Sequence, residues 1–226
     1  GVSANGDYDN GDNCGSVRVI AGSTFQTLFT LFGPTARDRF GSTIASLGDL
    51  TGDGFPEFVV GSRNSSATAS YAGAAQVHSA DGSLLFRLEG MNAGDLFGKR
   101  VSSADDMTGD GIPDFLVAAN RFDGAAGANT GAVFLYSGAD ASLVFQVEGE
   151  NAEDRFGGNI VGGHDLDGDG SPDFLVHAAA DGPSGLKAGS VTAFSSGGTK
   201  LFSLYGESPG DLFGSGLCFA GDLDGD

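Results

Sequence analysis

Acidic side chains recur along the chain in short clusters with a fixed internal spacing. The clearest cluster, DLDGDGSPD at residues 165–173, has oxygen-bearing side chains at its positions 1, 3, 5 and 9. Unneutralised carboxylates this close together repel one another, so the arrangement is favourable mainly when a cation lies among them. Oxygen donors at alternating positions of a short loop suit Ca²⁺, which takes about six to eight oxygen ligands. The cluster therefore predicts a calcium site.

The same pattern occurs at residues 49–57, 106–114 and 222–226. The backbone carbonyl at position 7 would add a ligand, and Gly at positions 4 and 6 allows the loop to fold around the ion. A Thr replaces the position-3 acid in the first two loops, which predicts weaker sites there. The predicted calcium ligands are Asp49, Thr51, Asp53, Phe55, Glu57, Asp106, Thr108, Asp110, Ile112, Asp114, Asp165, Asp167, Asp169, Ser171, Asp173, Asp222, Asp224 and Asp226, with Phe55, Ile112 and Ser171 contributing their carbonyls.

Two other readings of these loops are available. An EF-hand needs a bidentate Glu at position 12 followed by a helix, but position 12 is Val60, Val117 or Val176 within strand-like sequence. The loops could also be simple turns, because Asp-Gly is a favoured turn dipeptide. A turn needs one such pair, whereas here four aligned acids recur in register, which favours calcium. The lack of His and Cys in the set argues against zinc or copper.

The acidic loops belong to an internal repeat. A Phe-Gly pair occurs four times, at Gly41, Gly98, Gly157 and Gly214, with spacings of 57, 59 and 57 residues. An Asp stands two residues before each Phe and predicts a turn-forming side chain. Each unit continues with an acidic loop, an apolar run, a variable Gly/Ala/Ser-rich loop and two further strand-like segments. The continuously apolar runs predict strands buried on both faces, whereas the last segment partly alternates and predicts a strand nearer the rim.

Four antiparallel strands per repeat predict a β-propeller, with each unit forming one blade. A solenoid of parallel coils is the competing architecture, but it has shorter periods and one strand per face. We therefore predict an all-β chain that forms an incomplete ring of about four blades. Its parts are the end of a preceding blade at 1–37, blades at 38–94, 95–153 and 154–210, and the start of a truncated blade at 211–226.

Taken together, the Phe-Gly pairs, the Gly-Ala or Gly-Ser strand openings and the intervening acidic loops resemble FG-GAP repeats. These repeats form the propeller blades of integrin α-subunits and of many bacterial surface proteins. The resemblance covers nearly the whole chain, and it implies that calcium lies in the hairpin between the first two strands of a blade. That hairpin would be on the face away from the usual ligand surface.

Composition agrees with an all-β, cation-binding chain. Forty Gly, 18 Phe and no Trp favour many short strands and tight turns over helix bundles. A net charge of −19 with only 11 Lys and Arg argues against nucleic acid or anionic membranes as partners. No apolar stretch reaches the roughly 20 residues that span a bilayer, and the chain begins without Met or a secretory segment, so we expect an excised piece. For Cys14 and Cys218 we favour two free, semi-buried thiols over a bridge.

No catalytic motif such as G-x-S-x-G or H-E-x-x-H is present, and His78, His164 and His177 share no repeat position, so we predict no enzyme activity. The variable loops at 63–72, 120–130 and 179–188 could contact a ligand or could be unconstrained surface loops. We predict a calcium-stabilised adhesion or binding scaffold, extracellular or at a cell surface, with a protein or glycan ligand. The alternative is a non-catalytic propeller region of a larger secreted enzyme, a hydrolase or polysaccharide lyase.

Overall fold

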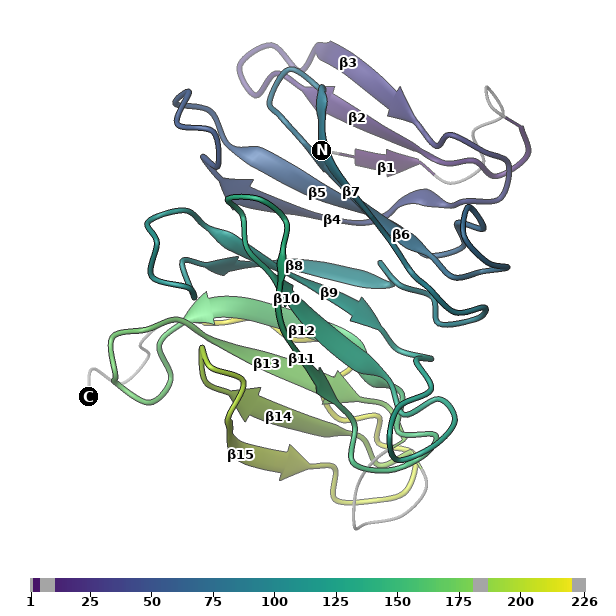
Figure 1. Cartoon of the computed structure of the whole chain (residues 1–226), viewed down its shortest axis with the longest axis vertical. Helices are drawn as coiled ribbons and strands as arrows, with labels where there is room; N and C mark the ends of the chain where they lie inside the picture. Colours follow the sequence, from purple (N-terminus) through teal and green to yellow (C-terminus); the bar gives the residue numbers. More distant parts are fainter. Residues whose placement is uncertain (1, 5–10, 181–186, 221–226) are drawn as a thin grey trace.

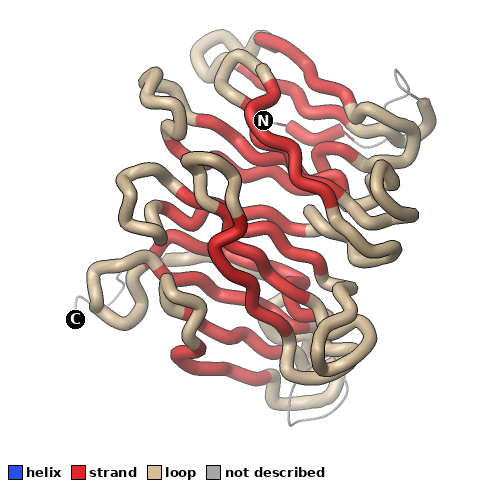
Figure 2. Tube along the Cα trace, in the orientation of Figure 1, coloured by secondary structure: helices blue, strands red, loops and turns tan. Residues whose placement is uncertain are grey.

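The computed structural model describes residues 2–4, 11–180 and 187–220, and in these ranges it consists of strands, turns and loops (Figures 1 and 2). The strands form one three-stranded and three four-stranded antiparallel sheets, each made of strands in chain order. The strands are β1 (Val2–Ala4), β2 (Ser16–Ile20), β3 (Thr27–Phe32); β4 (Phe40–Gly48), β5 (Glu57–Ser62), β6 (Ala74–His78), β7 (Leu84–Glu89); β8 (Arg100–Asp105), β9 (Asp114–Ala119), β10 (Ala132–Tyr136), β11 (Leu143–Glu148); β12 (Phe156–His164), β13 (Asp173–Ala178), β14 (Ser190–Phe194) and β15 (Lys200–Tyr205).

The sheets follow one another along the long axis of the molecule as the blades of an unclosed propeller (Figure 1). The predicted all-β propeller architecture is thus confirmed. Among the described residues, the first sheet has three strands rather than four.

Side-chain alternation in the middle strands builds two cores at once. All six residues of β9 are buried. Phe115 and Val117 pack toward the preceding blade, while Leu116 and Ala118 pack toward the following one. Because successive side chains of a strand point to opposite faces, a strand covered on both faces must be apolar throughout. The last strand of each blade, such as β11, is only partly buried, as expected for the rim.

The Phe-Gly pairs bring the backbones of adjacent segments into close contact. Gly98 has a φ of +76°, and a Cβ atom there would overlap the carbonyl oxygen of Ala74. The preceding acids stabilise turns, since Asp154 accepts a hydrogen bond from the backbone N–H of Asn151 at 2.8 Å. Asp211 accepts one from Ser208 at the same distance. Glycine is required at position 98, because both the positive φ and the nearby carbonyl oxygen of Ala74 disfavour a side chain there.

Neighbouring blades also touch through their first strands. The backbone N–H of Val101 in β8 donates to the hydroxyl of Thr43 in β4 at 3.4 Å. The N–H of Gly162 in β12 donates to Ser102 in β8 at 3.2 Å. These contacts set the spacing of the blades along their inner edge.

The two cysteines form no disulfide, and they differ in exposure rather than both being half-buried. Cys14 is buried and Cys218 is exposed. Among the residues that the structure describes, no helix is long and apolar enough to cross a membrane.

Candidate metal centre

The acidic loops lie side by side at one edge of the sheets. Each loop joins the first strand of a blade to the second, so β4–β5, β8–β9 and β12–β13 form three hairpins that point the same way (Figure 1). We call them the first, second and third acidic hairpins, at residues 49–57, 106–114 and 165–173. Each is an antiparallel connection between strands, which excludes the helical flanks of an EF-hand.

The position-1 carboxylates shape the hairpins by binding backbone N–H groups. Asp165 accepts from Gly168 at 2.7 Å and from Gly170 at 2.9 Å. The same bonds form in the first and second hairpins, to Asp49 and Asp106. The pKa of the Asp165 carboxyl is lowered, and the main cause is the hydrogen bond from the Gly170 backbone, so this carboxyl stays ionised. The loops thus present an anion at their start.

The position-9 carboxylates are buried beneath the hairpins. Glu57, Asp114 and Asp173 are each 0% exposed. Glu57 accepts a hydrogen bond from the backbone N–H of Leu50 at 2.6 Å, and Asp173 accepts one from Leu166 at 2.7 Å. These bonds fasten the start of each hairpin to its end. The residues predicted as metal ligands at position 9 are therefore also structural hydrogen-bond acceptors.

The third hairpin fits a cation best. Oxygen atoms of Asp165, Asp167 and Asp173 lie within 4.8 Å of one another. Oδ1 of Asp173 is buried and has no hydrogen-bond partner of ordinary geometry in the described chain. The net pKa of this carboxyl is raised, because burial and the charges of Asp167 and Asp169 outweigh the lowering effect of the Leu166 and Ser196 backbone groups. A cation would satisfy the free oxygen and relieve the repulsion.

The first and second hairpins fit less well. Among the described residues, three carboxylates come within 4.8 Å of one another in the third hairpin alone. In the second hairpin Asp114 is already satisfied, because it accepts from the backbone of Thr108 at 2.8 Å and of Gly138 at 3.1 Å. The first hairpin is intermediate, since Oε1 of Glu57 is buried and has no hydrogen-bond partner within the described ranges. The weaker calcium binding expected where Thr stands at position 3 stays a prediction.

Positions 5 and 7 are linked by one hydrogen bond in every hairpin. The position-7 backbone N–H of Phe55, Ile112 or Ser171 donates to the position-5 carboxylate, and the distances are 2.8, 2.8 and 2.7 Å. The acceptors are Asp53, Asp110 and Asp169. The role of the position-7 carbonyls stays a prediction. Asp222, Asp224 and Asp226 lie outside the described residues.

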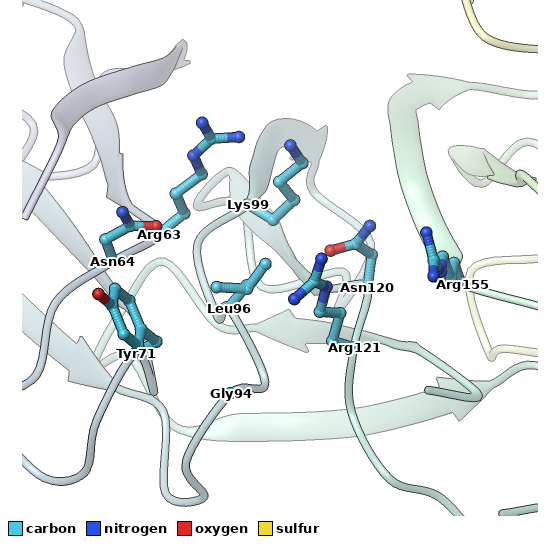
Figure 3. Close-up of a pocket in the computed structure, with 9 residues that line it drawn as sticks. All are labelled: Arg63, Asn64, Tyr71, Gly94, Leu96, Lys99, Asn120, Arg121 and Arg155. Carbon is cyan, nitrogen blue, oxygen red and sulfur yellow. The ribbon is translucent and has the colours of Figure 1, made fainter. Parts of the chain in front are cut away.

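Sequence reasoning missed a group of cations at the opposite edge of the sheets. Arg63, Lys99, Arg121 and Arg155 line one cavity there (Figure 3). The available signal was positional: each of these residues lies just after a second strand or within two residues of a Phe-Gly pair. The variable loops alone suggested only part of the set.

Comparisons with known proteins agree with the repeat. The FG-GAP repeat family matches residues 40–78 and 97–136. Human integrin alpha-7 is 32% identical over 162 residues, covering 67% of this chain and 13% of that protein. Xenopus laevis integrin alpha-5 is 36% identical over 99 residues, covering 40% of this chain and 9% of that protein. The chain thus spans only a small part of these relatives.

Among solved structures, the rhamnogalacturonan lyase YesW is similar, with 16% identity and a TM-score of 0.46 over 76% of this chain and 35% of the lyase. Each of the two segments that match the FG-GAP family starts at the Phe of a Phe-Gly pair and ends with the third strand of a blade, β6 or β10. The chain therefore belongs to the FG-GAP repeat family and is similar to integrin α-subunits.

Proposed function

We propose that the chain is a non-catalytic binding scaffold that is stabilised by calcium and acts outside the cell. The observation that carries the proposal is the arrangement of the third hairpin, where three carboxylates converge and one buried oxygen has no hydrogen-bond partner of ordinary geometry in the described chain. The hairpins lie at one edge of the sheets, and the described parts of the variable loops, which follow the second strands, lie at the other. One edge is thus suited to hold cations and the other to contact a ligand.

Asp165, Asp167 and Asp173 are the residues best placed to hold the ion. Bound calcium would supply positive charge and additional coordination to carboxylates that otherwise repel one another. Because Asp173 starts β13 and is bonded to Leu166, neutralising this group stabilises the hairpin and the blade together. The role of calcium is therefore structural.

The calcium affinity expected for such hairpins supports an extracellular location. Calcium sites of extracellular modules have Kd values on the order of 10⁻⁴ to 10⁻³ M, which match the calcium concentration outside cells. Hairpins with few carboxylates, such as the first and second, suit this weak range. The similarity to integrin α-subunits also supports a cell-surface setting and a protein or glycan ligand.

Calcium titration by calorimetry tests the metal site. Asp167→Asn removes a carboxylate that accepts a hydrogen bond from the backbone N–H of Asp169, and because the Asn amide oxygen can accept the same bond, the fold should tolerate the change. We expect this variant to lose the tightest site or to weaken it at least tenfold. The matched control is Asp140→Asn, which changes an exposed turn carboxylate outside the hairpins. Unchanged calcium binding in Asp167→Asn would contradict the proposal.

The binding role is tested by screening immobilised extracellular proteins and glycans. Capture should require calcium and should be lost when residues 120–130 are replaced by a Gly/Ser loop of equal length. Capture that persists after loop replacement, or no capture of any ligand, would overturn the scaffold role.

A further inference from the structure

The cavity at the edge opposite the acidic hairpins gathers positive charge in a strongly acidic chain. The chain carries 30 acidic residues and only 11 Lys and Arg. Arg63, Lys99, Arg121 and Arg155 nevertheless line a single cavity of about 520 Å³, which we call the cationic pocket. Figure 3 shows their side chains arranged around Leu96 and Asn120. A volume of this size falls in the range typical of small-ligand sites, roughly 300–1,000 Å³.

Topology explains why residues distant in sequence meet there. Arg63 follows β5 and Arg121 lies just past β9, so both stand where the second strand of a blade ends. Lys99 and Arg155 directly precede β8 and β12, where first strands begin. In an antiparallel pair, the end of the second strand and the start of the first lie at the same edge. Three consecutive blades therefore contribute to one pocket.

The positive charges of the pocket lack nearby counter-charges. In the described part of the chain, no carboxylate oxygen lies within 4.0 Å of the cationic nitrogens of Arg63, Lys99 or Arg121. Arg155 has one carboxylate partner among the described residues, the exposed Glu153, at 3.8 Å. The Nε of Arg63 is buried and has no hydrogen-bond partner among the residues that the structure describes. The nine described residues that line the cavity include no Asp or Glu.

Electrostatics agrees with this geometry. Burial, and then the positive charges of Arg63 and its neighbours, lower the pKa of Lys99 to about 8. Burial and the charges of Arg39, Arg100 and Arg121 likewise lower the pKa of Arg63. Like charges held together without a partner are unfavourable in the ligand-free protein. A bound anion would remove this repulsion and gain charge-assisted hydrogen bonds.

The rest of the lining indicates what carries the anion. Asn64, Asn120 and Tyr71 supply amide and hydroxyl groups that can both donate and accept, as sugar hydroxyls require. All nine lining residues lie in loops, so the pocket offers no strand edge to pair with an extended peptide. The chemistry therefore favours a compact polyhydroxylated anion over an acidic peptide.

We propose that the cationic pocket binds acidic saccharides, whose carboxylate or sulfate groups are held between Arg63, Lys99 and Arg121. The amides of Asn64 and Asn120 contact the sugar hydroxyls. This inference rests on the proposed binding role of the loop edge and gives its ligand a chemical class. Arg155 lines the side contributed by the third four-stranded blade.

Calorimetry on the calcium-loaded chain at low salt tests the proposal with defined probes. A hyaluronan tetrasaccharide carries carboxylates, a chondroitin sulfate tetrasaccharide adds sulfates, and a carboxyl-reduced hyaluronan tetrasaccharide is the neutral control. We expect at least one acidic saccharide to bind at least tenfold more tightly than the neutral one. The stronger of the two identifies the preferred anion. Arg63→Gln and Arg121→Gln should each weaken that binding at least tenfold.

The matched control is Arg18→Gln, which removes an equal charge from an exposed position on β2 outside the pocket. Calcium binding by the third acidic hairpin shows that each variant is folded. Equal binding of the neutral saccharide, tighter binding of a tetraglutamate peptide, or pocket variants that bind like the parent chain would each overturn the inference. If loop-dependent capture on the screen survives while both acidic saccharides fail, this inference is wrong and the scaffold role stands. If the screen shows no loop-dependent capture and the acidic saccharides also fail to bind, the scaffold role is wrong as well.

Discussion

The carboxylates of the acidic hairpins have two different roles, and a carboxylate's role depends on whether it is buried or exposed. Asp114 is fully buried and accepts hydrogen bonds from two backbone N–H groups, those of Thr108 and Gly138. Asp110 in the same hairpin is exposed and accepts one local bond from Ile112. The first residue holds the blade together, whereas the second is available to a cation.

This difference predicts unequal effects on stability in the absence of metal. Asp114→Ala leaves two backbone donors unpaired, the buried N–H of Gly138 and the partly buried N–H of Thr108, and should lower the free energy of unfolding by about 2–4 kcal/mol. Asp110→Ala, the matched control, should lower it by less than about 1 kcal/mol. Urea denaturation in EDTA measures both values. Equal losses would show that the position-9 carboxylate has no special structural role.

His177 makes stability depend on pH. Both of its ring nitrogens are buried without a hydrogen-bond partner among the described residues. Burial, with a smaller effect of Arg100, lowers its pKa from 6.5 to about 4. The unfolded chain therefore takes up this proton at higher pH than the folded chain does. The contribution of neutral His177 to the free energy of unfolding is therefore fully present above pH 6.5, and it is lost as the pH falls toward 4.

The expected loss across this window is about 3 kcal/mol, because each unit of pKa difference corresponds to about 1.4 kcal/mol. Denaturation in EDTA at several pH values measures it, and His177→Gln should flatten the slope. His164 stacks on Phe219 and is more exposed, so His164→Gln serves as the control. A slope unchanged by His177→Gln would assign the pH dependence to other groups.

At the scale of the element, the Phe-Gly turn sets how closely adjacent blades approach. Gly98 and Gly109 share a φ of +76°, but a Cβ on Gly98 would meet backbone atoms, whereas nothing lies near a Cβ on Gly109. Gly109→Ala should therefore cost only the left-handed strain, about 1–2 kcal/mol. Gly98→Ala should cost clearly more, because the backbone of Ala74 must also move. Thermal unfolding of both variants in EDTA compares them, and equal costs would mean that close approach is unimportant.

The elements were predictable from sequence because each follows a local rule. Apolar runs predicted the buried second strands, and the period of the Phe-Gly pairs predicted the blades. The difference in metal fit between the hairpins was only partly predictable. Thr108 at position 3 predicted a weaker site, but the second hydrogen bond to Asp114 comes from Gly138 in a different turn, which the loop sequence does not indicate. The cationic pocket could not be read from any one repeat, because its residues come from three blades and occupy different repeat positions.

At the scale of the whole molecule, the cores between blades are unequal. Among the described residues, the core that joins the first sheet to the next is formed by Val17, Phe40 and Val60, whereas the two following cores are much larger. A cavity of about 980 Å³ also lies beside β2 and the first acidic hairpin. The first sheet is therefore the least firmly packed.

Native-state hydrogen exchange should reveal this difference. Backbone amides of β2 should exchange through local opening, well before those of β9, which is buried on both faces. Addition of calcium should slow exchange in β12 and β13 more than in β2, since the third hairpin fits the ion best. Uniform protection across all sheets would contradict the unequal packing.

Calcium should raise the stability of the whole chain by a small, additive amount. At a tenfold excess over Kd, each occupied site contributes about 1.4 kcal/mol. A thermal scan with and without EDTA should show a higher Tm with calcium, and Asp167→Asn should reduce the difference. A Tm that is independent of calcium would mean that the hairpins are held by their hydrogen bonds alone.

The contacts between first strands have a mechanical consequence. Thr43 joins β4 to β8, and Ser102 joins β8 to β12, so each described blade is tied mainly to its neighbours in the chain. A pulling force applied to the two ends would then detach the blades one after another rather than all at once. An atomic force microscope should record this as a series of separate rupture events, and calcium should raise the force of those in which an acidic hairpin is torn open.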